Sequence, residues 1–260
     1  MEVIITADAG EASAEAARIA AALLRAKPRS VLGLATGSTP LRFYDALAAL
    51  HARGEIDFSQ VTTFNLDEYV GLGPDHPQSY ALYMRDHFFS RVNLPPDRTH
   101  LPDGLAPDIP AHCAAYENAI REAGGIDLQV LGIGSDGHIG FNEPGSSLGS
   151  RTRLKTLSES TVRDNARFFP SPGGVPRHVI TMGVGTILDA RHCMVLAFGE
   201  AKAGAVAAMA EGPVTADAPA SALQFHPKCT LLVDNAAAGG LKRAEYYRWV
   251  YANKPEWQRP

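Results

Sequence analysis

The sequence has few cysteines, and none of them are spaced as a metal or redox pair. Its 260 residues include only Cys113, Cys193 and Cys229, with no C-x-x-C motif. The odd number argues against a disulfide framework, and the wide spacing argues against a zinc site. We therefore expect no bound metal and a reducing compartment, the cytoplasm.

Long apolar runs and clusters of like charge are also missing. The most apolar helix-like region, Ala14 to Leu24, is interrupted by Glu15 and Arg18 and is too short to span a bilayer. The first residues, MEVIITADAG, lack the basic-then-apolar order of a signal peptide. The formal net charge is −4, and no basic run stands out. This balance argues against nucleic acid or a membrane surface as a partner.

Short β-rich runs alternate with helical patterns along the whole chain. Strands are predicted at Val3–Thr6, Ser30–Leu34, Val61–Phe64, Leu128–Leu131, His178–Met182, Cys193–Phe198 and Thr230–Val233. Helices are predicted at Glu11–Arg25, Thr39–Arg53, Gln78–Arg91, Ile109–Ala123, Glu200–Glu211 and Leu241–Tyr251. This alternation predicts one α/β domain over residues 1–260, a doubly wound, Rossmann-like and mostly parallel sheet sandwiched by helices. In such folds ligands bind beyond the carboxyl ends of the strands.

The segment ATGSTP follows the second predicted strand and opens a helix. Gly37, Ser38 and Thr39 offer backbone N–H groups and hydroxyls, and Pro40 suits the first helical turn. A helix start of this kind favours a phosphate, because its unpaired N–H groups and its dipole both attract an anion. The alternative is a plain N-cap by Ser38 or Thr39. No lysine follows the glycine as a P-loop would require.

The segment NLDEYVGL follows the third predicted strand and carries Asp67 and Glu68. Neighbouring residues of an extended chain point in opposite directions, so at most one of the two should face the crevice. The alternative is a solvated acidic pair.

The segment LGIGSDGHIGFNEP, Leu131 to Pro144, has glycines at 132, 134 and 137 in G-x-G-x-x-G order after a predicted strand. That order is typical of a dinucleotide-binding loop. A dinucleotide loop requires the third glycine to open a helix, and Pro144 prevents a sustained helix here. We therefore expect a tight loop rather than a cofactor site.

The same loop gathers Asp136, His138 and Glu143. A carboxylate beside an imidazole orients the ring and raises its basicity, which suits proton transfer. The alternative is a structural histidine in a polar turn.

Two cations are candidates for holding an anion. Lys202 lies at the start of a predicted helix, where its charge opposes the helix dipole unless an anion is near. Alternatively, Lys202 is an exposed lysine whose charge is screened by water. Arg167 in DNARFF is the second candidate, and alternatively it is a surface arginine near Asp164. The following segment, FPSPGGVPR, is rich in proline and glycine, as a lid or an ordinary surface loop would be.

Together these motifs resemble the isomerising glucosamine-6-phosphate deaminase family. The matching segments are GLATGSTP, FNLDEYVGL, HPQSY, GIGSDGHIGFNEPGSS, SRTRLKTL, NARFFPS and GEAKA, in family order from Gly33 to Lys202, and ASALQFH extends the match to His226. The resemblance implies hydrolytic deamination and aldose–ketose isomerisation of D-glucosamine 6-phosphate to D-fructose 6-phosphate and ammonia, a step of amino-sugar catabolism. It implies no cofactor and no catalytic metal, and a doubly wound α/β fold with a mobile lid.

The resemblance also implies roles for the catalytic residues. The family's enolisation base falls on Asp67, and its ring-opening histidine falls on His138. Asp136 and Glu143 fall on the carboxylates that support this histidine.

The family's substrate-phosphate site falls on the turn of Gly37, Ser38 and Thr39, with Arg167 and Lys202 closing over the anion. The region from 158 to 176 resembles the family's lid. The resemblance also implies a small sugar phosphate as the substrate.

Ser146, Arg153 and Lys155 match positions that some family members use to bind N-acetylglucosamine 6-phosphate as an allosteric activator at a subunit interface. The family includes hexamers and monomers, so a homo-hexamer stays open. For Arg153 and Lys155 the alternative is a charged strand edge that discourages aggregation.

Two other functions are alternatives for this sequence. A 6-phosphogluconolactonase is similar in fold and has a D-G-H loop, but that loop continues toward Leu-Phe-Pro, whereas here it continues as IGFNEPGSS with Glu143. A non-catalytic sugar-phosphate sensor would carry a helix-turn-helix. Here the first strand starts at Val3 and one aromatic-rich helix follows Leu241. A sensor also has no need of Asp67 together with His138.

Overall fold

Seven short strands form one parallel sheet in the computed structural model, which describes residues 1–166, 169 and 174–258. The strands are β1 Glu2–Thr6, β2 Val31–Leu34, β3 Thr62–Asn65, β5 Thr99–His100, β6 Leu128–Leu131, β9 Cys193–Ala197 and β10 Cys229–Asp234. Their order is β1-β10-β9-β6-β2-β3-β5, and every pairing is parallel. The predicted doubly wound α/β fold is confirmed.

The six predicted helices are present, with their ends shifted by a few residues. They are α1 Ala9–Ala26, α2 Leu41–Ala52, α3 Tyr80–His87, α4 Ile109–Glu122, α7 Ala203–Glu211 and α8 Ala244–Ala252. Two short helices, α5 Glu159–Asn165 and α6 Val184–Leu188, were not predicted, because five to seven residues are too few to show an apolar period. Side chains define several starts: Asp8 accepts hydrogen bonds from the N–H groups of Gly10 and Glu11 and so caps α1.

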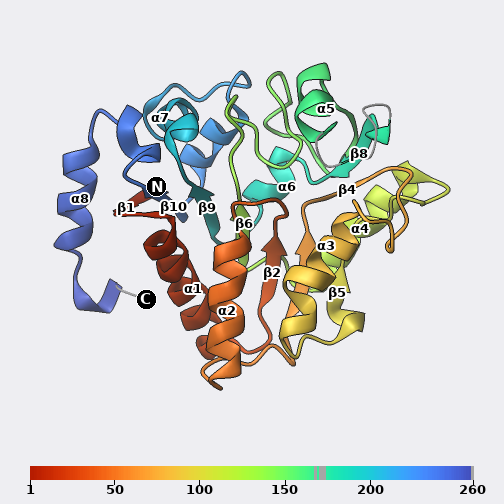
Figure 1. The fold of residues 1–260 in the computed structure, drawn as a ribbon, viewed down its shortest axis with the longest axis horizontal. Coiled ribbons are helices and arrows are strands. Elements are labelled where there is room, and N and C mark those ends of the chain that lie inside the picture. Colours follow the sequence, from red (N-terminus) through yellow and green to blue (C-terminus); the bar gives the residue numbers. More distant parts are fainter. Residues whose placement is uncertain (167–168, 170–173, 259–260) are drawn as a thin grey trace.

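The helices cover both faces of the sheet. Figure 1 shows α1 and α2 side by side across one face, where Ala16, Ala20 and Leu47 are fully buried in one apolar cluster. A second cluster covers the other face and includes Tyr116 and Ile120 of α4. Because both faces are buried, the strands read as continuous apolar runs, as parallel strands do.

One predicted strand does not belong to the parallel sheet. β8 His178–Thr181 pairs antiparallel with β4 Asp67–Tyr69 and with β7 Arg153–Thr156, in a separate sheet of order β4-β8-β7. The strand predicted at 178–182 is therefore present, but it belongs to the small antiparallel sheet and not to the parallel sheet. Residues 179–181 are buried because β8 is the central strand of the small sheet, so their composition is that of a buried parallel strand.

The strand order places one crevice at the centre of the molecule. β2 and β6 are neighbours, but the chain continues from β2 toward β3 on one side and from β6 toward β9 on the other. Ligands of open α/β sheets bind where the strand order reverses in this way. The loops 35–39 and 132–138 leave β2 and β6 at this point, and α5 with the small sheet lies beyond it (Figure 1).

The three cysteines have free thiols and are buried. In the part of the chain that the structure describes, no helix is both long enough and apolar enough to cross a membrane.

Candidate active site

A cavity of about 320 Å³ lies at this reversal of strand order. Its walls include these predicted site residues: Gly37, Ser38, Thr39, Asp67, His138 and Lys202. A larger hollow of about 490 Å³ lies at the amino ends of the strands, between α1 and Lys254, and contains none of them. The carboxyl end of a parallel sheet is the general ligand site, so we assign the active site to the smaller cavity.

Asp67 begins β4 directly after the chain leaves the parallel sheet. It is 6% exposed, and the carboxylate makes no hydrogen bond within the described part of the chain. Burial, followed by the nearby charge of Glu68, raises the pKa of Asp67 to about 8. A Cβ atom at Gly140 would lie 3.6 Å from its Oδ2, so this carboxylate abuts the glycine loop after β6. An unpaired, buried carboxylate of raised pKa is suited to accept a proton.

Glu68 points away from the cavity and stabilises α3. Its carboxylate accepts hydrogen bonds from the N–H groups of Tyr69 (2.9 Å), Tyr80 (3.0 Å) and Ala81 (2.9 Å). Two of these belong to the first turn of α3, where a negative charge also favours the helix dipole. The prediction that at most one of Asp67 and Glu68 faces the crevice is confirmed. The alternative of a solvated pair is wrong, since Glu68 is 2% exposed.

His138 is held by Asp136. Its Nδ1 lies 2.7 Å from Oδ1 of Asp136, which also accepts from the His138 N–H at 3.2 Å. The hydrogen bond to His138 lowers the pKa of Asp136 to about 2, so Asp136 stays ionised at neutral pH. The ring lies against Gly134, where any Cβ would come within 2.2 Å of Nδ1. With Nδ1 turned to Asp136, Nε2 is left for a bound molecule.

Glu143 connects the loop after β6 to α5. Its carboxylate is buried and accepts hydrogen bonds from the N–H (3.1 Å) and Oγ (2.7 Å) of Ser158 and from Oγ1 of Thr161. Ser158 is the N-cap of α5. None of the hydrogen bonds that Glu143 makes with described residues involves His138.

The loop after β2, residues 35–39, has backbone N–H groups without hydrogen-bond partners among the described residues. Pro40 is the N-cap residue of α2 and no side chain caps this helix, so the alternative of a plain N-cap by Ser38 or Thr39 is wrong. The N–H groups of Gly37, Ser38 and Thr39 form no hydrogen bond with any residue that the structure describes. Such a set of free donors at a helix start is suited to an anion.

Lys202 lies at the first turn of α7 and reaches the same cavity. Burial lowers its pKa, while the charge of Asp136 acts in the opposite direction. Arg167 lies outside the described residues, as do 168 and 170–173 of the region 158–176 that resembles a lid.

The three residues matching an allosteric site lie near the small sheet. Arg153 and Lys155 are two apart on β7, so their side chains leave the same face. Arg153 donates from Nη1 to Oδ1 of Asn142 at 2.9 Å, and burial lowers its pKa. Ser146 is buried, and its hydroxyl has no hydrogen-bond partner in the described part of the chain. β7 is also an edge strand, so the charged-edge alternative stays open.

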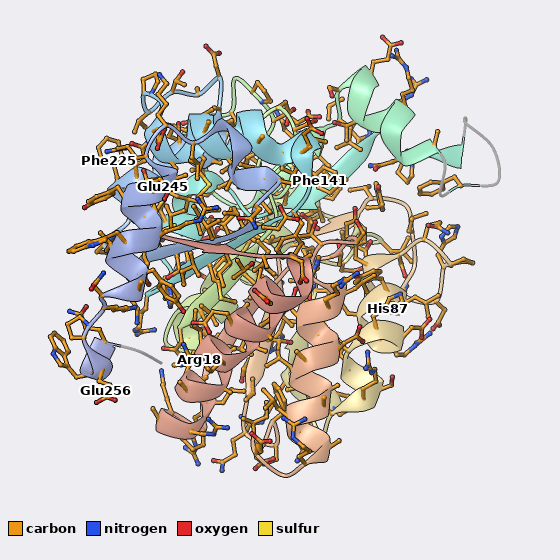
Figure 2. The ribbon with its side chains drawn as sticks, turned by 60° about the vertical axis from the view of Figure 1, so that its left-hand side comes forward. Arg18, His87, Phe141, Phe225, Glu245 and Glu256 are labelled. Atoms are coloured by element: carbon orange, nitrogen blue, oxygen red, sulfur yellow. The ribbon has the colours of Figure 1, made fainter. Side chains whose placement is uncertain are left out.

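Other residues of the cavity wall were not predicted from the residues themselves. They include Tyr80, Phe141, Thr161 and Asn165. Figure 2 shows Phe141 inside the molecule, below α5. Tyr80 lies in HPQSY, a segment of the family resemblance, so that signal was available. Thr161 and Asn165 come from α5, whose short sequence gave no helical signal.

No group of three or more His, Cys, Asp or Glu side chains is placed to hold a metal ion within residues 1–166, 169 and 174–258.

Comparisons with known proteins agree on one family. Residues 6–232 match the family model for glucosamine-6-phosphate isomerases and 6-phosphogluconolactonase. A glucosamine-6-phosphate deaminase of Arthrobacter sp. (strain FB24) is 59% identical over 258 residues, 99% of each chain, and one of Streptomyces coelicolor is 55% identical over 259 residues, also 99% of each chain.

Solved structures of both kinds of protein named in this family model resemble the chain. The structure of a monomeric glucosamine-6-phosphate deaminase superposes with a TM-score of 0.90 at 46% identity, over 92% of this chain and 100% of the other. A 6-phosphogluconolactonase from Trypanosoma brucei shares the fold, with a TM-score of 0.70 at 22% identity over 92% of this chain and 98% of the other.

Proposed function

Since this chain belongs to the family of glucosamine-6-phosphate isomerases and 6-phosphogluconolactonase, we propose that it converts D-glucosamine 6-phosphate to D-fructose 6-phosphate and ammonia. The observation that carries this proposal is the buried carboxylate of Asp67, which abuts the loop that holds His138. The relatives that are 52–59% identical are named deaminases, whereas the lactonase from Trypanosoma brucei is 22% identical. The deaminase is therefore favoured over a lactonase or a sugar-phosphate sensor.

The pyranose ring opens first in the proposed reaction. His138 takes the proton of the C1 hydroxyl and delivers it to the ring oxygen, so the C1–O5 bond breaks and an aldehyde forms at C1. Asp136 keeps the imidazole oriented and stabilises its protonated form. Glu143 is the second supporting carboxylate, and in the described structure it holds the start of α5.

Deamination then follows from proton transfers at C1 and C2. The C1 carbonyl makes the C2 proton acidic, and Asp67 removes it to give an enolamine. A proton returns at C1 to give the imine at C2, and water adds to C2 and expels ammonia. The net reaction hydrolyses a C–N bond, and each well-placed proton transfer contributes about 10²- to 10⁴-fold to the rate.

The phosphate of the substrate is proposed to bind at Gly37, Ser38 and Thr39, with Lys202 and Arg167 closing over it. Three free N–H groups beside a partly buried lysine support this assignment. The binding energy of this remote group holds C2 against Asp67. The region 158–176 is proposed to act as a lid over the bound sugar.

The direct test is release of ammonia from D-glucosamine 6-phosphate, measured by coupling to a second enzyme. The same protein is offered 6-phosphogluconolactone, with acid release as the readout. Ammonia release without lactone hydrolysis supports the proposal. Lactone hydrolysis alone would assign the chain to the other branch of its family.

Lys202→Ala should chiefly weaken binding of the phosphorylated sugar. A charge-assisted contact contributes about 1.5–3 kcal/mol, so KM should rise about 10- to 100-fold while kcat changes less. Steady-state kinetics check this, with Lys242→Ala as the control because that lysine is exposed and outside the cavity. An unchanged KM in Lys202→Ala would remove Lys202 from the phosphate site.

The rate should rise with pH up to about 8. Only deprotonated Asp67 accepts the C2 proton, and its pKa is raised to about 8, so kcat/KM should increase about tenfold per pH unit below that value and level off above it. The charge of Glu68 contributes to this raised pKa, so Glu68→Gln should move the rising limb to lower pH. Titration of the substrate is common to both proteins, so the difference between the two profiles reports Asp67. Identical profiles would contradict the assignment.

We further propose that Ser146, Arg153 and Lys155 bind N-acetylglucosamine 6-phosphate as an activator and that the chain forms a hexamer when they do. The buried, unpartnered hydroxyl of Ser146 and the two cations on one face of β7 support this site. Repeating the ammonia assay with the N-acetylated sugar, alongside sedimentation of the protein, tests both parts. An unchanged rate of ammonia release would refute the activator site. A protein that sediments as a monomer with and without the N-acetylated sugar would refute the hexamer.

A further inference from the structure

Two tyrosine hydroxyls hold the loop between β2 and α2 by its carbonyl groups. Tyr44 of α2 donates to the carbonyl of Ala35 at 2.6 Å, inside the core. Tyr83 of α3 donates to the carbonyl of Gly37 at 2.5 Å. The bond from Tyr83 holds Gly37, at the centre of the proposed phosphate loop, whereas the bond from Tyr44 holds Ala35, which precedes that loop.

The bond from Tyr83 determines the direction of one N–H group. The carbonyl of Gly37 and the N–H of Ser38 belong to one peptide group, and in a trans peptide they point in opposite directions. The described chain has no cis peptide bond. Drawing the Gly37 carbonyl toward Tyr83 therefore turns the Ser38 N–H away from Tyr83. Gly37 has φ +99°, a conformation that a side chain would disfavour.

Tyr83 and the catalytic residues line two adjoining hollows, and the proposed phosphate loop borders both. Tyr83 lines a hollow of about 450 Å³ together with His87 of its own helix, and Gly37 and Ser38 line both this hollow and the catalytic cavity. Lys202 and Asp67 line the catalytic cavity, and Tyr83 is not part of that wall. The Ser38 N–H points away from Tyr83 and has no hydrogen-bond partner among the described residues, so it stays free for an anion in the cavity that Ser38 and Lys202 line.

The neighbours of Tyr83 keep its ring in place. The ring packs against His87, labelled in Figure 2, with 4.5 Å between ring centroids. Burial raises the pKa of the Tyr83 hydroxyl, so it stays protonated and donates at neutral pH. The first turn of α3, which carries Tyr83, is itself held by Glu68.

We propose that Tyr83 is a positioning residue for phosphate binding, which acts by holding the Gly37 carbonyl so that the Ser38 N–H faces the anion. This inference rests on the proposed phosphate site at residues 37–39. Tyr83 touches no reacting atom and influences affinity for the phosphate group rather than the proton transfers.

The test is Tyr83→Phe, which removes the hydroxyl and keeps the ring. KM for D-glucosamine 6-phosphate and the inhibition constant of inorganic phosphate should both rise about 3- to 10-fold, the factor for one typical hydrogen bond, with kcat within about twofold. Tyr44→Phe is the matched control, because it removes the same group from another carbonyl of the same loop. It should lower Tm, since it leaves a buried carbonyl unpaired, and should leave both constants within about twofold.

Three outcomes would overturn the proposal: unchanged constants in Tyr83→Phe, a lowered kcat with unchanged constants, or an equal rise of both constants in Tyr44→Phe. Calorimetric titration of wild type and Tyr83→Phe with inorganic phosphate gives the same comparison without turnover. An inactive wild type that binds phosphate more tightly than Tyr83→Phe would refute the proposed reaction and support this role. An active wild type with an unaffected Tyr83→Phe would do the reverse.

Discussion

Asp67→Asn should lower kcat by about 10²-fold or more while KM for D-glucosamine 6-phosphate stays within about threefold. The amide has the size of the carboxylate but cannot accept the C2 proton. Asp67 makes no hydrogen bond within the described residues, so the substitution leaves no partner unpaired. Steady-state ammonia release measures both constants. A variant that keeps more than about a tenth of the wild-type rate would show that another group is the base.

Thermal unfolding separates this loss of rate from a loss of structure. The pKa of Asp67 rises from 3.8 to about 8 on folding, so the stabilisation from its protonated form is complete below pH 3.8 and is lost as the pH rises through about 8. Asparagine does not titrate. The Tm of Asp67→Asn should therefore match that of wild type below about pH 4 and exceed it near pH 9. A variant that is less stable at pH 9 would have lost a structural contact as well.

His138→Gln should lower turnover of the mostly cyclic substrate by about 10²-fold or more, because glutamine does not shuttle a proton near neutral pH. Asp67 would remain able to act on the small open-chain fraction that exists in solution. Residual activity should therefore follow the supply of open-chain sugar.

Deuterium at C2 distinguishes a catalytic from a structural role for His138. If ring opening limits the variant, the C2 isotope effect should be smaller than in wild type. If the ring only fills the space above Gly134, the variant should lose Tm, and its folded fraction should show the wild-type isotope effect. That second result would refute the ring-opening role.

Reasoning from strand ends predicted where the cavity forms. The loops after β2 and β6 meet because these strands are neighbours at the reversal of strand order, a consequence of parallel topology that alternating elements already indicate. The prediction that at most one of Asp67 and Glu68 faces the crevice is confirmed, since it depends only on the period of an extended chain.

The small sheet could not be predicted in the same way. β8 pairs with β4 and β7, which are respectively 111 and 25 positions earlier at their first residues, and such long-range pairing leaves no local pattern. The contact of Glu143 with Ser158 depends on that sheet, because β7 carries the chain from the loop to α5. The Tyr83 contact with Gly37 likewise joins residues 46 positions apart.

The hydrogen bonds from the first turn of α3 to Glu68 connect the position of this helix to that of β4. In the proposed reaction Asp67 acts on C2, and the adjacent Glu68 holds the helix whose Tyr83 bonds to the loop proposed for the phosphate. A displacement of β4 therefore moves the base and the anchor of the phosphate loop together. If the proposed roles hold, we expect the site to select for substrate length, so that a sugar phosphate one carbon shorter should react more slowly than D-glucosamine 6-phosphate.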